Sequence, residues 1–220
     1  MFKKVMIIFV FIVICFIFIF KEEVAVVNVE KINLNLKEEE IGVVFIDQDK
    51  DDYLLILSDK VSLLLVLDNL KQDIEKILNK FNVYDVKFIL IKDNNIRIDK
   101  NIIKLMDYYK EGDIEFFLKE DIIKIVYGDT SFCIYINSTA NKLDIFDCNL
   151  VYFYKVLNIP YLKINERTDV IFYHYERPLP SYLVEKIYEK WINTYMIRNN
   201  EWTVIKIGDG YYNIIVIPNS

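Results

Sequence analysis

The chain has 220 residues, a length that suits one domain with a sizeable core once an N-terminal apolar segment is set aside. Apolar residues make up 54% of the chain, which excludes extended disorder, and strand-forming Ile, Val, Tyr and Phe are abundant. The formal net charge is −6 and the lysines are interspersed with acidic residues, so no basic face is expected and nucleic acid is not an expected partner.

The first predicted element is an uninterrupted apolar run from Val5 to Phe20, which follows Lys3-Lys4 and ends at Lys21. A charged start followed by an apolar stretch is typical of a cleaved secretory signal or of a membrane anchor. No small-x-small cleavage site follows Phe20, which favours the anchor. The two lysines place the N-terminus in the cytoplasm.

We therefore predict a single-pass cell-membrane protein that contacts the membrane through residues 5–20. Residues 1–23 are the expected signal anchor, and residues 24–220 are the expected domain on the extracytoplasmic side. Secretion after signal cleavage is the alternative.

Further along the chain, period-two alternation and short apolar runs predict strands, and apolar residues at helical spacing predict helices. The predicted strands are 24–36, 43–47, 53–57, 63–67, 86–91, 114–118, 122–127, 132–136, 170–173, 203–207 and 212–217. The predicted helices are 69–81, 100–110 and 181–196.

Residues 45–56, 65–69 and 83–91, in the same order and with suitable gaps, resemble segments of the metallo-β-lactamase-like domain of ComEC-type competence proteins. Residues 45–56 read F-I-D-Q-D-K-D-D-Y-L-L-I against the pattern F-L-D-V-G-Q-G-D-x-x-L-I of that family. Residues 65–69, L-V-L-D-N, resemble its L-L-I-D-T-G strand end. Residues 83–91 resemble the strand that leads into its metal motif.

Two later segments extend this resemblance to about residue 216. Residues 125–132, I-V-Y-G-D-T-S-F, resemble the family's L-x-Y-G-x-x-S-F hairpin. Residues 177–180, R-P-L-P, followed by a predicted helix and a strand, are similar to its closing H-P-H-P segment. The resemblance implies an α+β fold, a metallo-β-lactamase-like αββα sandwich preceded by the N-terminal membrane segment.

The family's hydrolytic motif, H-x-H-x-D-H, is absent. Its place is taken by residues 92–98, K-D-N-N-I-R-I, and His174 is the one histidine of the chain. Imidazoles and a carboxylate must converge to hold two catalytic metal ions. We therefore expect no zinc, no other cofactor and no metal-dependent hydrolysis of the family's kind. His174 is interpreted as structural.

The resemblance also defines a degenerate cleft, whose candidate residues are Asp47, Asp52, Asp68, Asp93 and Arg177. One hypothesis is a non-catalytic relative of the family, a pseudoenzyme that serves as a binding or scaffolding module for an unknown protein partner. The alternative is a phosphodiesterase-type hydrolase that holds a hard divalent cation such as Mg²⁺ or Ca²⁺ on carboxylates.

Two further features remain open from the residues alone. Cys133 and Cys148 can pair in an oxidising compartment, but sequence spacing does not decide whether their sulfurs meet. The aromatic group Tyr152, Phe153 and Tyr154 is interpreted as core, because basic residues do not accompany it as they would on a surface that stacks nucleic-acid bases.

Overall fold

A computed structural model describes the chain over most of its length. The described residues are 31–48, 51–68, 74–91, 102–119, 122–136, 147–154, 166–198 and 201–218. The chain divides into two units, Met1–Lys31 and Ile32–Ser220, and both sheets belong to the second.

The first sheet, sheet A, has seven strands in the order β14-β13-β1-β2-β3-β4-β5. Its strands are β1 (Ile41–Gln48), β2 (Asp51–Leu57), β3 (Ser62–Val66), β4 (Lys87–Leu90), β5 (Ile102–Lys104), β13 (Glu201–Gly208) and β14 (Tyr211–Pro218). Neighbours are antiparallel from β14 to β3, whereas β3, β4 and β5 are parallel.

The second sheet, sheet B, has seven strands in the order β12-β11-β10-β9-β8-β7-β6. Its strands are β6 (Tyr108–Glu111), β7 (Ile114–Lys119), β8 (Ile122–Tyr127), β9 (Thr130–Tyr135), β10 (Leu150–Phe153), β11 (Val170–His174) and β12 (Asn193–Ile197). Strands β6 to β9 form an antiparallel meander, and β9 to β12 are parallel to one another.

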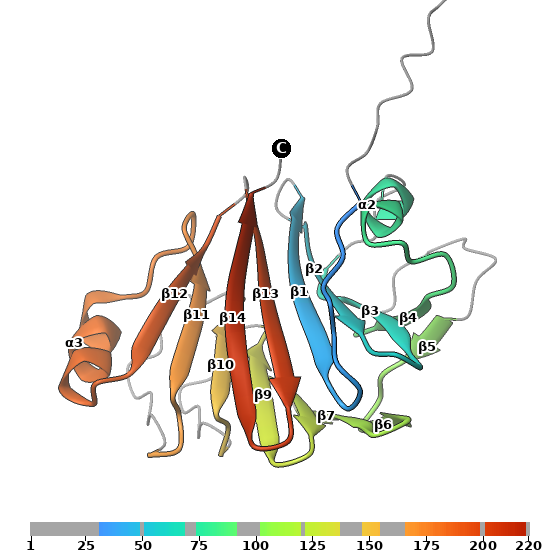
Figure 1. Ribbon diagram of the computed structural model, residues 1–220. Helices are drawn as coiled ribbons and strands as arrows, with labels where there is room; N and C mark the ends of the chain where they lie inside the picture. The colour runs from blue at the N-terminus through green and yellow to red at the C-terminus, as the bar shows by residue number, and fades with distance from the viewer. Residues whose placement is uncertain are drawn as a thin grey trace, which may run out of the picture. The chain divides into compact units, whose positions relative to one another are not determined.

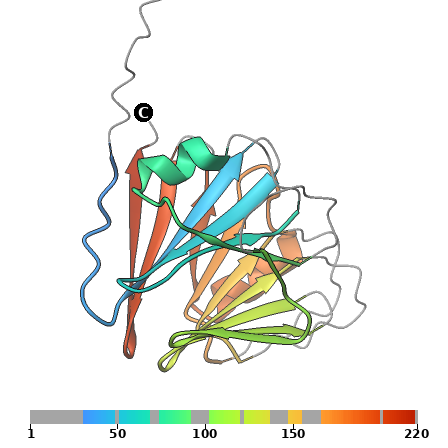
Figure 2. The ribbon, with the colours of Figure 1, turned by 90° about the vertical axis from the view of Figure 1, so that its right-hand side faces the viewer.

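The main core lies between the two sheets, because alternate side chains of each strand point to opposite faces. On β2, Leu54 and Ile56 belong to the cluster shared with sheet B, while Tyr53 and Leu55 belong to the cluster on the outer face. Figures 1 and 2 show the two sheets stacked in this way. Both faces of the central strands are therefore buried.

One short helix packs on each outer face. Helix α2 (Ile74–Lys80) places Ile74 and Leu78 on the outer face of sheet A. Helix α3 (Ser181–Glu189) places Leu183 and Ile187 on the outer face of sheet B. In Figure 1 the two helices lie at opposite sides of the domain.

The predicted αββα sandwich with an N-terminal membrane segment is wrong for the part of the chain that the structure describes. Strands dominate it, and the 7-residue α2 and the 9-residue α3 are too short to form helical layers. The predicted helix 100–110 is instead strands β5 and β6, because its β-branched and aromatic residues pair with β4 and β7.

Two other predicted elements differ from the structure. The predicted helix 181–196 ends early, since residues 193–197 pair in parallel with β11 as strand β12. Residues 31–36 of the predicted strand 24–36 form no regular element, although Leu34 and Leu36 pack over Gly42 of β1. A Cβ at Gly42 would come within 3.0 Å of Leu34, so glycine allows this close crossing.

The prediction of a single-pass membrane protein on the extracytoplasmic side is likewise corrected. From residue 31 onwards, none of the helices described is both long and apolar enough to cross a membrane. The apolar run 5–20 and the predicted anchor 1–23 lie outside the described residues.

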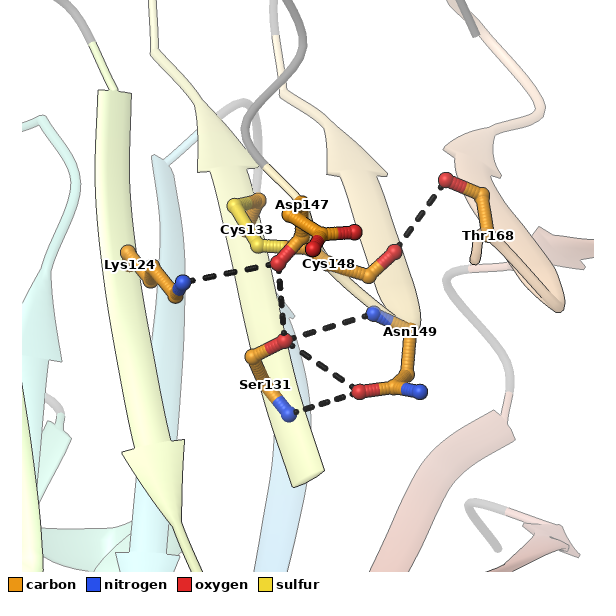
Figure 3. Close-up of a disulfide and its surroundings, with 7 residues drawn as sticks. All are labelled: Lys124, Ser131, Cys133, Asp147, Cys148, Asn149 and Thr168. Carbon is orange, nitrogen blue, oxygen red and sulfur yellow. Dashed lines mark hydrogen bonds between the residues drawn. A yellow bond between two sulfur atoms is a disulfide. The ribbon is translucent and has the colours of Figure 1, made fainter. Parts of the chain in front are cut away.

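A disulfide joins Cys133 of β9 to Cys148, two residues before β10, with Cα atoms 5.9 Å apart (Figure 3). Next to it, Asn149 Oδ1 accepts hydrogen bonds from the Ser131 backbone N–H at 3.1 Å and from the Ser131 hydroxyl at 3.2 Å. The Thr168 hydroxyl donates to the carbonyl of Cys148 at 3.1 Å. The cross-link and these bonds fix the start of β10 against β9 and the residues before β11.

Candidate functional site

The candidate site lies where the carboxyl ends of parallel strands from both sheets meet. Asp68 follows β3 in sheet A, Tyr154 follows β10 in sheet B, and Arg177 lies three residues after β11. Asp52 joins this end because β2 runs antiparallel to β3, and its carbonyl accepts the Leu67 backbone N–H at 3.3 Å. The carboxyl ends of parallel strands are the usual position of binding sites in open sheets.

At its centre is an ion pair that spans the two sheets. An Arg177 guanidinium N–H (Nη1) donates to Asp52 Oδ2 at 3.0 Å. The Asp52 side chain is 5% exposed and that of Arg177 is 22% exposed. The same Nη1 donates to the Tyr154 carbonyl at 3.0 Å, so the charge of Arg177 is held by two acceptors.

Two tyrosines of β10 and its end complete the cluster. The Tyr152 hydroxyl donates to Asp52 Oδ2 at 2.9 Å, and the Tyr154 hydroxyl donates to Asp68 Oδ2 at 3.3 Å. The Arg177 guanidinium carbon lies 4.8 Å from the Tyr154 ring centroid, within cation–π range. One cation, two carboxylates and two phenols therefore form a connected group.

The aromatic core holds Tyr152 in this place. Its ring meets that of Phe45 edge to face, with centroids 5.0 Å apart, and Phe45 also packs on Phe132 and Phe172. Because Tyr152 belongs to the inter-sheet core, its hydroxyl reaches Asp52 from the apolar side of the site. The polar cluster thus closes one end of the core.

Burial sets the protonation states of the two phenols. Burial raises the pKa of Tyr152 well above its usual value, and the charge of Asp52 and the hydrogen bond to it act in the same direction. The pKa of Tyr154 is raised by burial and by the charges of Asp52 and Asp68. Both phenols are therefore neutral donors at physiological pH, and neither is suited to act as a nucleophile or base.

Two opposing effects act on the pKa of Arg177. Burial lowers the pKa of Arg177, but the charge of Asp52 and the neighbouring tyrosines outweigh it, so the pKa of Arg177 is raised. The guanidinium is therefore permanently charged. It supplies inside the protein the positive charge that Asp52 needs in order to stay buried.

Of the five residues predicted for the degenerate cleft, the structure brings three together: Asp52, Asp68 and Arg177. Asp47 pairs with Asp52 across the β1–β2 hairpin, but only its backbone is described. Asp93 lies outside the described residues. Among the described residues there is no group of three or more His, Cys, Asp or Glu side chains arranged to hold a metal ion.

Sequence reasoning missed the roles of Tyr152 and Tyr154, which it assigned to the core alone. Their spacing of two on an apolar strand was the available signal, because it points both side chains to one face of the sheet. His174 is buried beside this end of β11, and its Nδ1 accepts the Glu176 backbone N–H at 3.1 Å. That bond orders the turn that carries Arg177.

The chain was compared with protein-family models, curated proteins and solved structures. No family model, no curated protein and no solved structure matches it.

Proposed function

We propose that the chain is a non-catalytic binding or scaffolding module, related in its short motifs to the metallo-β-lactamase-like domain of ComEC-type competence proteins although its described residues form no αββα sandwich. The observation that carries the proposal is the ion pair between Arg177 and Asp52. Hydrolysis in that family requires metal ions held by imidazoles and carboxylates. Here the Arg177 guanidinium neutralises the Asp52 carboxylate, which a bound metal ion would need as a ligand.

The chemistry of the cluster supports this assignment. Both phenols are neutral donors, and each is directed at a carboxylate. The fixed charge of Arg177 repels a divalent cation that approaches Asp52, and the hydrogen bonds to Asp52 Oδ2 compete with metal coordination there. The group is thus built to hold two sheets together at one end rather than to activate water.

The relationship to the competence-type domain gains support from where its matched segments fall. Residues 45–56 form the β1–β2 hairpin and contribute Asp52, residues 65–69 contribute Asp68, and residues 177–180 contribute Arg177. These three segments are far apart in the sequence and meet in one cluster. A set of unrelated short matches would not be expected to converge in this way.

Metal binding by the purified full chain tests the proposal. We expect elemental analysis to find no stoichiometric zinc or manganese. Calorimetric titration with Mn²⁺, Mg²⁺ or Ca²⁺ should detect no binding, and a phosphodiester substrate should not be hydrolysed above background. Two metal ions per chain, together with hydrolysis that is lost on chelation, would contradict the proposal and favour the carboxylate-based hydrolase.

A variant makes this test sharper. Arg177→Gln removes the charge while keeping hydrogen-bonding groups, whereas Arg198→Gln alters an exposed arginine at the end of β12 and serves as the matched control. If Arg177 takes the place of a metal ion, divalent cations should raise the melting temperature of Arg177→Gln and leave that of Arg198→Gln unchanged. An equal response in both variants would count against this role for Arg177.

A further inference from the structure

The four edge strands of the two sheets differ in how they are protected. Strands β5 and β6 are three and four residues long and carry charged residues, which is how proteins commonly discourage pairing at an edge. Strand β14, by contrast, has eight residues, Y-Y-N-I-I-V-I-P, and no charge. Strand β12, N-T-Y-M-I, is also uncharged. Within the described chain, each has a strand neighbour on one side only.

The two uncharged edges lie on the same side of the domain (Figure 1). Tyr195 of β12 stacks on the core residue Phe172 at a centroid distance of 5.8 Å and so faces the space between the sheets. Tyr212 of β14 is partly buried and packs against the same inter-sheet cluster that contains Phe172. We call this side, with β12 and β14, the open side.

Two apolar side chains that face inward at the open side remain exposed. Tyr195 is 39% exposed although it stacks on the core. Val216 of β14 pairs with Thr203, which lies on the same face of β13 as the core residues Ile205 and Ile207. Val216 therefore also faces inward, yet it is 47% exposed. Sheet A therefore ends too early to cover the inner face of β12. One more strand beside β14 would cover both residues.

We propose that a second copy of the chain supplies this strand, with β14 of each copy pairing antiparallel to β14 of the other around a twofold axis. Such pairing is self-complementary, because the same edge serves both copies. It satisfies backbone groups along β14 with up to about eight hydrogen bonds, fewer at Pro218, which has no N–H. The uncharged sequence brings no like charges together.

The chemistry of β14 favours a second copy over an unrelated extended segment. Covering Tyr195 requires an extended, uncharged strand with apolar side chains on its inner face. The inner face of β14 offers Ile214 and Val216 for this purpose. The twofold arrangement lets each copy cover the exposed Tyr195 of the other at the same time. This inference does not rest on the proposed function, since it uses no residue of the Arg177 cluster.

The test uses the full chain and a pair of matched variants. Val216→Lys places a charge on the β14 edge, and twofold symmetry would bring two lysines into one interface. Val184→Lys makes the same substitution at a residue that is 49% exposed on helix α3, which packs on the outer face of sheet B and not on the β14 edge. Light scattering after size-exclusion chromatography gives the mass of each protein, and circular dichroism verifies that each is folded.

We expect the unaltered chain and Val184→Lys to have about twice the 26.3 kDa mass of one chain at micromolar concentration. Val216→Lys should weaken the dimer by more than about tenfold, because the two copies bring like charges together in one interface. Hydrogen exchange should show protection of residues 211–218 that decreases on dilution.

A monomeric chain at micromolar concentration would overturn the proposal. So would a dimer that survives Val216→Lys, since association would then use another surface, such as the apolar run 5–20. Loss of the dimer in Val184→Lys would move the interface to helix α3 and would also overturn it. Should Val216→Lys fail to fold, concentration-dependent hydrogen exchange of the unaltered chain decides the question.

Discussion

Removing the charge of Arg177 should destabilise the protein severely. Arg177→Met keeps most of the aliphatic length but leaves Asp52, whose side chain is 5% exposed, without its cation. Breaking a buried ion pair from one side costs about 3–5 kcal/mol. Arg177 is itself 22% exposed and Tyr152 still donates to Asp52, so we place the loss at about 2–3 kcal/mol.

That loss is a large part of the free energy of unfolding, which for a domain of this kind is about 5–15 kcal/mol. Urea denaturation followed by circular dichroism measures it as a lower midpoint with an unchanged slope. Arg198→Met is the matched control, because Arg198 is 55% exposed and lies 3.9 Å from Glu201. Its effect should be within about 0.5 kcal/mol of zero.

A double-mutant cycle separates the ion pair from other effects of the substitution. In an Asp52→Asn background no buried charge is left unpaired, so Arg177→Met should cost less by about 1–3 kcal/mol. If Arg177→Met changes the stability of the unaltered chain by less than about 0.5 kcal/mol, the central role given to this ion pair is refuted. If Arg177→Met lowers the free energy of unfolding by the same amount in both backgrounds, the coupling between Arg177 and Asp52 is refuted, although Arg177 itself still contributes to stability.

Three further outcomes are expected. The free energy of unfolding should fall as pH rises above 10, because tyrosine ionises there in the unfolded chain while the pKa of Tyr152 in the folded protein is raised well above that value. In urea titrations, Tyr152→Phe should make this dependence of stability on pH weaker. Replacing Cys133 and Cys148 by alanine should cost about 3 kcal/mol in denaturant, as expected for a cross-link with a sequence separation of 15; no change would show that the cross-link is absent in solution. Gly208→Ala places a Cβ against the outer end of the Tyr211 ring, so Tyr211 must move and give up its hydrogen bond to Glu40. We expect a melting-temperature loss equivalent to about 0.5–1.5 kcal/mol, and an unchanged melting temperature would contradict this role of the bond.

Much of the strand pattern was predictable because it follows from local alternation. Strands β1, β2 and β7 were all found close to their predicted bounds. What failed was the assignment of segments whose pattern also suits a helix. Residues 100–110 and 193–197 have apolar residues at mixed spacing, and pairing with β4, β7 and β11 decided their conformation. Such long-range pairing has no local signal.

The site was partly predictable for a different reason. Asp52, Asp68 and Arg177 were selected because they occupy motif positions of a resembling family, and the structure brings them together. Their partners Tyr152 and Tyr154 were not selected. A tyrosine on an apolar strand is assigned to the core unless the position of a carboxylate that faces its hydroxyl is known. The contact between Tyr152 and Asp52 joins residues 100 positions apart, which local pattern does not reveal.

The disulfide bears on the alignment of the strands that carry the site. Strands β9 and β10 are parallel, so no tight turn sets their register. A shift of β10 by one residue would turn Tyr152 to the outer face and bring Val151 or Phe153 inward. The bond between Cys133 and Cys148 lies four residues before Tyr152 and limits how far β10 can slide along β9. The disulfide is remote from Asp52 and Arg177. By limiting the register of β10, it nevertheless helps to keep the Tyr152 hydroxyl in place to donate to Asp52.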